Sequence, residues 1–266
     1  MSEPLLVLQD VVKHYQRPRA WFGPQTAAVR AVDGVSLALA KGEALGLVGE
    51  SGSGKSTLAR LIVGLERVTS GSIRLEGREL TALTAAEWRP LRKKVQMIFQ
   101  DPHSSLDPRQ SAASIVAEPL AIHRIGERRG RRKRALELLE AVGLAPAQAG
   151  HYPHEFSGGQ RQRIGIARAL ALAPDLVVCD EPVSALDVSI RSQILNLLHE
   201  LQERFGLAYL FIAHDLSVVR ALCARVAVMQ AGKIVEIADR DELFARPQHS
   251  YTRSMLASAP RCGWQS

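Results

Sequence analysis

The sequence predicts an α/β fold with a mainly parallel sheet, on three observations. Short apolar or alternating segments that resemble strands recur along the chain and alternate with helical patterns. One of them, residues 176–180, is apolar up to its last residue, as strands buried on both faces of a parallel sheet are. A glycine-rich stretch at residues 49–57 joins an apolar strand to a helix start. Together they indicate a sheet whose strands are connected through helices.

The individual elements follow in chain order. Strands are expected at residues 5–8, 35–39, 44–48, 72–77, 95–99, 176–180, 208–213 and 226–229. Helical patterns cover residues 58–65, 112–121, 132–142, 160–172 and 188–205, and two short helices are expected from Asp239 onward. Residues 16–25 are interpreted as an exposed loop. Because helical patterns separated by Gly and Pro fill residues 101–172, we expect a helical insertion there within the α/β core.

Composition limits the class of protein. A chain of 266 residues with 46% hydrophobic residues can form one large α/β domain or two closely joined subdomains, and it is not expected to be disordered. Neither a run of 18 apolar residues nor a signal peptide is recognised, so no membrane span is predicted. Cys179, Cys223 and Cys262 are far apart, which argues against a disulfide framework or a zinc cluster and favours a reducing cytosol.

The chain is basic, with 34 Lys and Arg against 27 Asp and Glu and a net charge of +7. Seven Arg or Lys residues lie between Arg124 and Arg134. This basic run is interpreted as a solvated loop and helix face, and contact with an anionic membrane or with nucleic acid are the alternatives. Since no aromatic residue interrupts the run, a base-stacking surface is poorly supported.

The glycine-rich stretch matches the pattern G-x-x-x-x-G-K-[ST]. Glycines let successive backbone N–H groups turn inward, and the helix start behind them adds partial positive charge, so the loop can cradle phosphate. Lys55 is predicted to reach the β- and γ-phosphates, and the Ser56 hydroxyl to bind Mg²⁺. The alternative is a glycine-rich turn with an accidental Lys-Ser pair. The predicted nucleotide-binding residues of this loop are Gly49, Glu50, Ser51, Gly52, Ser53, Gly54, Lys55, Ser56 and Thr57.

Two adjacent carboxylates end the apolar strand at residues 176–180. Asp180, at the strand tip, is predicted to bind Mg²⁺ through water. Glu181 is then placed to orient and deprotonate an attacking water. An ordinary acidic turn is the alternative for the pair.

A second candidate phosphate site lies at the start of the helix predicted near residue 160. Its residues, which offer backbone N–H groups at a helix start, are Ser157, Gly158, Gly159 and Gln160. A simple helix cap is the alternative. Because one chain rarely needs two such sites for one triphosphate, we interpret them as halves of sites completed by two chains facing head to tail.

Three further polar residues follow strands or the carboxylate pair. His214 comes directly after the strand at residues 208–213, on the side where α/β sheets bind ligands, and can hydrogen-bond the γ-phosphate or the water. A buried structural histidine is the alternative. Gln100 also ends a strand and has the reach to touch Mg²⁺ or water. Asp187 ends the segment of residues 184–187, just after Glu181, and is also predicted to belong to the nucleotide site.

In this order, the segments resemble the ATPase subunit of an ABC transporter. The resemblance implies a P-loop NTPase core with a mainly parallel sheet, an N-terminal antiparallel β subdomain and an inserted helical subdomain. It also places an adenine-stacking aromatic at Tyr15, for which a solvent-facing tyrosine is the alternative. The matching segments are the Walker A loop at residues 49–56, the Q-loop at Gln100, the family signature at residues 157–160, Walker B at residues 176–180, the catalytic glutamate at Glu181, the D-loop at residues 184–187 and the switch histidine at His214.

Two stretches are similar to one branch of that family. Residues 99–108 resemble the Q-loop segment of oligopeptide and dipeptide importers, and residues 248–256 resemble their C-terminal extension; nickel and glutathione importers share both. The insert after Tyr15 is similar to the second of the two ATPase subunits of such importers. We therefore expect an ABC ATPase domain at residues 1–245 and a short extension at residues 246–266. Its only cysteine is Cys262, so no iron–sulfur cluster is predicted.

The resemblance implies an Mg²⁺-dependent ATPase that uses ATP to power peptide import, with nickel or glutathione as alternative cargoes. Two ATPase subunits, more readily a heterodimer than a homodimer, would sandwich two ATP molecules and drive two transmembrane permease subunits. An extracytoplasmic binding protein would be an indirect partner. The chain is then expected at the cytoplasmic face of the bacterial inner membrane as a peripheral protein.

A soluble ABC ATPase acting on nucleic acid is the main rival. Such proteins usually carry two ATPase domains, zinc cysteines or a long coiled coil, and the sequence contains none of these. Nucleic acid is therefore not an expected partner. A non-catalytic module with this fold is disfavoured, because every catalytic position is filled.

Overall fold

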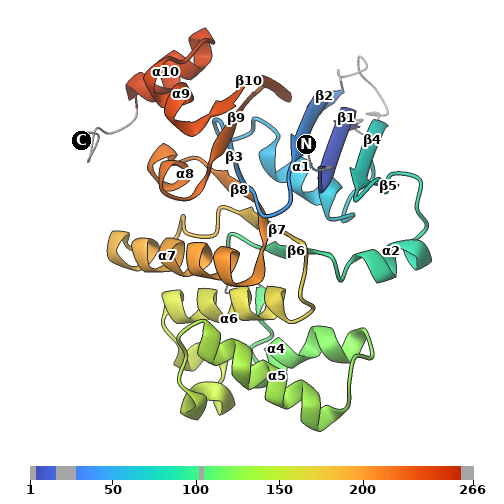
Figure 1. Cartoon of the computed structure of the whole chain (residues 1–266), viewed down its shortest axis with the longest axis vertical. Coiled ribbons are helices and arrows are strands. Elements are labelled where there is room, and N and C mark those ends of the chain that lie inside the picture. The colour runs from blue at the N-terminus through green and yellow to red at the C-terminus, as the bar shows by residue number, and fades with distance from the viewer. Residues whose placement is uncertain (1–3, 16–27, 102–104, 259–266) are drawn as a thin grey trace, which may run out of the picture. The chain divides into compact units, whose positions relative to one another are not determined.

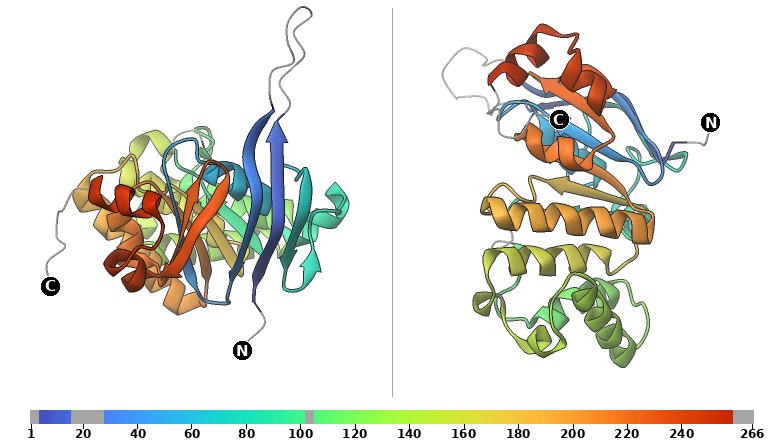
Figure 2. Two further views of the ribbon diagram at one scale, coloured as in Figure 1. Left: turned by 90° about the horizontal axis from the view of Figure 1, so that it is seen from above. Right: turned by 60° about the vertical axis from the view of Figure 1, so that its left-hand side comes forward.

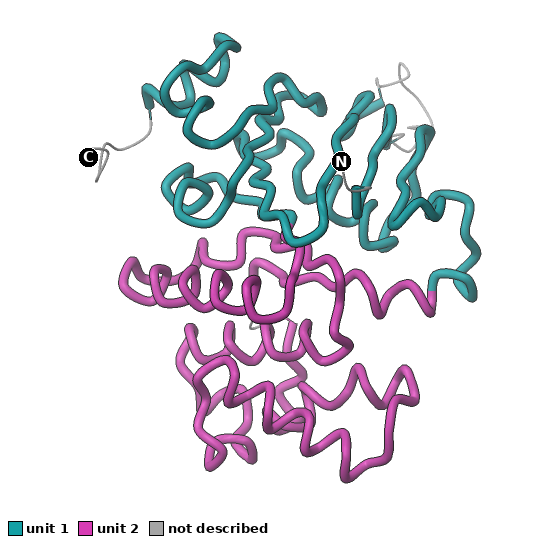
Figure 3. The backbone as a smooth tube through the Cα atoms, in the orientation of Figure 1, with its two compact units in different colours: residues 1–88, 210–266 teal, residues 89–209 magenta. Residues whose placement is uncertain are grey.

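The computed structural model describes residues 4–15, 28–101 and 105–258. It divides into two compact units, which Figure 3 distinguishes by colour: unit 1 is formed by residues 1–88 and 210–266, and unit 2 by residues 89–209. The chain passes between the units within α2 (Ala85–Leu91) and within β8 (Ala208–Ala213). The loop expected at residues 16–25 lies outside the described residues.

The first sheet of unit 1 is antiparallel and contains the N-terminal strands. Its order is β2-β1-β4-β5, and each neighbouring pair is antiparallel. The long strands β1 and β2 lie side by side (Figure 2). Their bounds, with those of β4 and β5, are β1 Leu6–Tyr15, β2 Val29–Leu39, β4 Ser70–Leu75 and β5 Arg78–Glu79. The antiparallel β subdomain implied by the resemblance is confirmed.

The second group of strands in unit 1 has the order β10-β9-β3-β8. Strands β3 (Ala44–Val48) and β9 (Arg225–Gln230) run parallel, and β3 is buried along its whole length. Strand β10 (Lys233–Asp239) pairs with β9 in the antiparallel sense and was not predicted, because its mostly half-buried or exposed residues lack a clear apolar run. The helices of unit 1 are α1 Lys55–Ile62, α8 Leu216–Leu222, α9 Arg240–Ala245 and α10 Ser250–Ser258 (Figure 1). The last two confirm the expected pair of short helices.

Unit 2 combines two parallel strands with most of the long helices. Strand β6 (Val95–Ile98) pairs with β7 (Leu176–Asp180), and Ile98 lies opposite Cys179. Helix α6 lies alongside α7 (Figure 2). The helices are α4 Ala112–Ile122, α5 Arg128–Ala141, α6 Gly158–Leu170 and α7 Val188–Phe205, with short 3-10 turns at Pro146–Gly150 and Pro153–Glu155.

The helical patterns expected within residues 101–172 are confirmed as α4, α5 and α6, with shifted ends. Helix α5 begins four residues earlier than predicted, because its first turns are basic and carry no apolar periodicity. Buried leucine and isoleucine side chains from all three helices, among them Ile115, Leu138 and Ile164, form the core beneath them. Within the three described ranges, every helix is either too short or too polar to cross a bilayer.

Candidate functional site

The glycine-rich loop lies between β3 and α1 in unit 1, where the sequence places it. A Cβ atom on Gly49 would lie 2.1 Å from the carbonyl oxygen of Met229, and one on Gly54 would lie 2.0 Å from the carbonyl oxygen of Ala31. Both glycines also have positive φ, at 154° and 107°. The loop therefore requires glycine at these two positions, because the backbone of β9 and β2 comes too close for any side chain.

Lys55 lies inside this loop rather than on the surface. Its side chain is buried, and its ammonium donates hydrogen bonds to the carbonyl oxygens of Gly49 at 2.7 Å and Glu50 at 2.8 Å. A weaker bond reaches the Ser53 hydroxyl at 3.3 Å. A concave loop around a buried cation, with the start of α1 behind it, has the charge and shape that a polyphosphate needs. The half-buried Ser56 hydroxyl beside Lys55 is a suitable Mg²⁺ ligand.

Tyr15 ends β1 and is 37% exposed. Its hydroxyl donates to the Glu66 carboxylate, and the Lys13 ammonium lies 5.0 Å from its ring centroid. Burial and the bond to Glu66 raise the pKa of Tyr15, while a hydrogen bond with the Thr57 side chain opposes them. Tyr15 therefore lies beside the end of the glycine loop. Its predicted stacking on adenine stays a prediction.

His214 follows β8 directly, as the sequence predicts. Its side chain is exposed, so the alternative of a buried structural histidine is wrong. The next residue, Asp215, caps α8 by accepting hydrogen bonds from the N–H and the hydroxyl of Ser217. The cap fixes the turn that carries His214.

In unit 2, the structure brings Gln100 and Glu181 together. The side-chain amide of Gln100 donates to the Glu181 carboxylate at 3.2 Å. The register of β6 and β7 explains this contact: Ile98 lies opposite Cys179, and each of the two polar residues comes two positions later. Glu181 has a positive φ of 49°, and its carbonyl oxygen accepts from both the N–H and the hydroxyl of Ser184. Its carboxylate is therefore held by a defined turn.

Asp180 ends β7 and is 7% exposed. A carboxylate at a strand tip, next to the half-buried Glu181, has the oxygen donors that Mg²⁺ prefers. Its predicted role at the metal stays a prediction.

Residues 157–160 form the N-terminus of α6. The Ser157 hydroxyl accepts from the Gln160 N–H, and the Gln160 side chain accepts from the Ser157 N–H. This reciprocal cap is the simple helix cap considered as an alternative, and it uses both polar side chains. A Cβ atom on Gly159 would lie 2.5 Å from Ile190 of α7, and one on Gly158 would lie 3.6 Å from Leu186. Asp187 occupies the N-cap position of α7 without a capping hydrogen bond from its side chain, and it is exposed. The two predicted segments 157–160 and 184–187 are therefore neighbours within unit 2.

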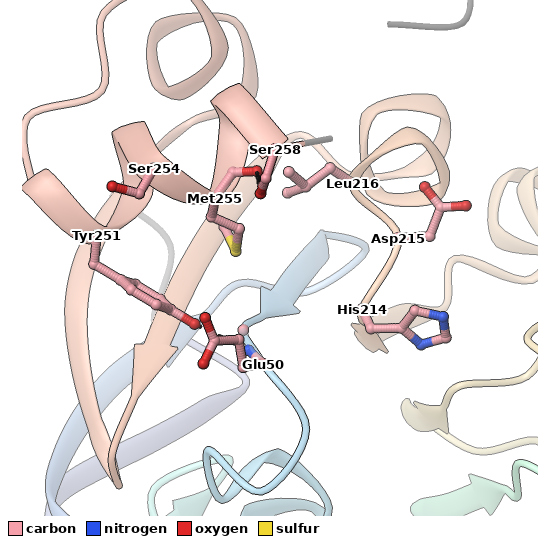
Figure 4. A pocket seen from close by; sticks show the side chains of 9 residues that line it. Glu50, His214, Asp215, Leu216, Tyr251, Ser254, Met255 and Ser258 are labelled. Carbon is pink, nitrogen blue, oxygen red and sulfur yellow. Dashed lines mark hydrogen bonds between the residues drawn. The ribbon is translucent and has the colours of Figure 1, made fainter. Parts of the chain in front are cut away.

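One contact of the glycine loop was not predicted from the sequence. The hydroxyl of Tyr251, on α10, accepts a hydrogen bond from the Glu50 N–H at 3.0 Å. Beside it, a cavity of about 710 Å³ is lined by Gly49, Glu50, residues 214–216 and the inner face of α10 (Figure 4). Tyr251 lies within the stretch similar to importer extensions, but the pattern gave it no role.

Comparison with known structures defines the class of fold. The dimeric ATP-binding cassette MJ0796, in a post-hydrolysis state with ADP and Pi, matches with a TM-score of 0.78 and 32% identity, over 88% of this chain and 98% of that one. Subunit cbiO1 of the Clostridium perfringens transporter complex cbiONQ matches with a TM-score of 0.79 and 26% identity, over 92% of each chain. The fold is that of an ATP-binding cassette, and the predicted fold class is confirmed.

Comparison with sequences defines the family. The profile described as ABC transporter matches residues 32–184. The oligopeptide transport ATP-binding protein AppF of Bacillus subtilis (strain 168) is 52% identical over 97% of this chain and 79% of its own length. A putative peptide import ATP-binding protein of Brucella abortus (strain 2308) is 56% identical over 88% of this chain and 70% of its own. The chain belongs to the ABC transporter family of ATPases, which couple ATP hydrolysis to transport.

Proposed function

We propose that this chain is the ATP-hydrolysing subunit that powers import of peptides through a membrane permease. The observation that carries the proposal is the 52% identity, over 97% of the chain, to an oligopeptide transport ATP-binding protein. The loop geometry around Lys55 supports ATP as the nucleotide that is bound and hydrolysed. Nickel and glutathione are not favoured as cargo, since the relatives compared above are named for peptides.

The site residues take the following roles in this proposal. Residues 49–57 bind the triphosphate, and Tyr15 stacks on the adenine. The Ser56 hydroxyl and, through water, Asp180 hold Mg²⁺, which neutralises phosphate charge when bound. Glu181 accepts a proton from the attacking water, and Gln100 orients its carboxylate. Gln100 is also a candidate for contact with the metal. His214 hydrogen-bonds the γ-phosphate or the water.

The remaining site residues act on a second ATPase subunit. Residues 157–160 offer N–H groups at the start of α6 to the triphosphate held by that subunit, and Asp187 faces the same composite site. Because Ser157 and Gln160 already cap each other, the free N–H groups of the first turn are the ones available to phosphate. We infer a heterodimer of ATPase subunits that docks on two permease subunits at the cytoplasmic face of the cell membrane, with a peptide-binding protein on the opposite side.

Purification of the tagged chain from native membranes in mild detergent tests this proposal. Two permease subunits and a second ATPase should co-purify. ATP hydrolysis by that complex should rise when a peptide-loaded binding protein is added, and nickel or glutathione should have no such effect. Recovery of ribosomes or DNA without a permease would contradict the proposal, and stimulation by nickel or glutathione alone would correct the cargo.

A further inference from the structure

The C-terminal helix α10 contacts the glycine loop through one defined polar bond. Figure 4 shows Tyr251 pointing from α10 towards Glu50, across the edge of the cavity of about 710 Å³. The Tyr251 hydroxyl accepts from the Glu50 N–H at 3.0 Å. Beyond Tyr251, the cavity lies between α10 and the loops that follow β3 and β8. Around this cavity, α10 is therefore not tightly packed against the nucleotide loop.

The peptide group that Tyr251 holds is the one that also holds Lys55. The Glu50 N–H and the Gly49 carbonyl belong to one planar peptide, so fixing one end fixes the other. The N–H end donates to Tyr251, and the carbonyl end accepts from the Lys55 ammonium at 2.7 Å. Hydrogen bonds in such a chain polarise and strengthen one another. Tyr251 is therefore two hydrogen bonds and one peptide away from the lysine that is proposed to bind phosphate.

Helix α10 is itself fixed to the sheet that carries the loop. The Glu236 carboxylate, on β10, accepts from the N–H groups of Gln248 at 2.8 Å and His249 at 3.0 Å, the two residues directly before α10. Burial alone would raise the pKa of Glu236, but these hydrogen bonds keep the pKa below its ordinary value. Strand β10 pairs with β9, whose Met229 carbonyl lies against Gly49. The segment that carries Tyr251 is thus attached to β10, and the glycine loop packs against β9, the strand paired with β10.

We propose that Tyr251 is a positioning residue for the nucleotide loop: it orients the Gly49–Glu50 peptide and keeps the loop in the form that binds ATP. The C-terminal extension thereby tunes nucleotide affinity from outside the nucleotide site. The inference rests on the proposed role of residues 49–57 in ATP binding.

Titration of the full chain with a fluorescent ATP analogue and Mg²⁺ tests the inference. Tyr251→Phe keeps the ring and removes the acceptor, so the dissociation constant should rise about two- to ten-fold. Glu236→Gln, which weakens the anchor of α10, should act in the same direction. The double variant should lose less affinity than the two single losses predict, because both changes break one chain of contacts. Tyr152→Phe, which removes a hydroxyl from an exposed tyrosine in unit 2, is the matched control and should have no effect.

Two further readouts separate positioning from general stability. The melting temperature of nucleotide-free Tyr251→Phe should stay close to that of the parent chain, and in the permease complex KM for ATP should rise while kcat changes less than KM. Unchanged or tighter ATP binding by Tyr251→Phe would overturn the inference. So would an affinity loss matched by a large drop in melting temperature. Lys55→Ala separates the proposed ATP binding by residues 49–57 from the proposed role of Tyr251. If Lys55→Ala binds ATP normally, the role of the loop fails. If Lys55→Ala loses ATP affinity and Tyr251→Phe does not, only the role of Tyr251 is overturned.

Discussion

At the scale of single residues, the contact between Gln100 and Glu181 is the feature with the clearest chemical consequence. The two residues are 81 positions apart in sequence and meet at 3.2 Å because they follow paired positions of β6 and β7. A hydrogen bond from a neutral amide orients a carboxylate without placing an opposite charge beside it. This geometry is what the proposed base needs before nucleotide binds.

Glu181→Gln should therefore abolish turnover and preserve binding. The amide of the variant still has an oxygen that accepts the bond from Gln100, so the geometry is kept while the proton acceptor is lost. Hydrolysis measured by phosphate release should fall about 100- to 10,000-fold, with ATP affinity unchanged. Glu200→Gln, at an exposed position of α7, is the control and should hydrolyse ATP normally. Normal turnover by Glu181→Gln would exclude the proposed base.

At the scale of elements, α6 and α7 approach closely at Gly159, where a side chain would meet Ile190. Gly159→Ala would place a Cβ atom 2.5 Å from Cγ2 of Ile190, so the Ile190 side chain or one of the helices must shift. We expect a loss of about 1–3 kcal/mol in the free energy of unfolding, measured by chemical denaturation.

Gly165→Ala provides the matched control for that change. It lies on the same helix, and its Cβ atom would meet nothing within 4 Å. Replacing a helical glycine by alanine there should be neutral or stabilise by up to about 1 kcal/mol. Equal destabilisation by both variants would show that the contact with Ile190 is not the cause.

A second element, the β4–β5 pair, should give the protein a measurable response to acid. Burial would raise the pKa of Glu79, but hydrogen bonds from the side chains of Ser72 and Thr81 and from backbone N–H groups lower it to about 2, from an ordinary value near 4.5. A carboxylate with a lowered pKa stabilises the fold above its unfolded pKa, and this contribution disappears as pH falls from about 4.5 towards 2.

Glu79→Gln should consequently lower the melting temperature at pH 7, and the difference from the parent chain should shrink below pH 4.5. Thermal melts between pH 7 and pH 3.5 measure it. Glu140→Gln, at an exposed position of α5, should show no such pH-dependent difference. A difference for Glu79→Gln that stays constant with pH would contradict the role of the ionised carboxylate.

At the scale of the whole molecule, the main source of the charge of +7 is the basic run at residues 124–134, most of which lies on α5. In the structure the run is mostly exposed, and Arg131 donates to the carbonyl oxygens of Ile125 and Gly126 at the start of the helix. Arg134 lies 3.6 Å from Glu137 on the same helix. These local contacts favour the solvated helix face among the three interpretations of the run.

Replacement of Arg128, Arg129 and Arg132 by glutamine should accordingly leave function unchanged. All three side chains are exposed, so the fold should keep its melting temperature. ATP hydrolysis and recovery of the permease complex should match those of the parent chain. Loss of membrane recovery that anionic lipid restores would instead assign the run to the membrane surface, and loss of a bound nucleic acid would support the rival function.

Local sequence determined the nucleotide loop, the carboxylate pair and most strands and helices. Their signals are short-range: glycine spacing, apolar periodicity and capping residues act within a few positions of the chain. Helix α7 at residues 188–205 and the position of His214 directly after β8 agree with the prediction. The ends of α5 and α6 were predicted less well, because basic and glycine residues hide the helical period there.

Only the tertiary structure decided which distant residues meet. The pairing of Gln100 with Glu181 depends on the register of two strands, the need for glycine at position 159 depends on a neighbouring helix, and the bond from Glu50 to Tyr251 joins residues 201 positions apart. The sequence by itself determined that the chain has a glycine-rich loop between a strand and a helix, an acidic strand end and an α/β fold. The contacts that orient these parts come from packing between distant segments, which no local pattern encodes.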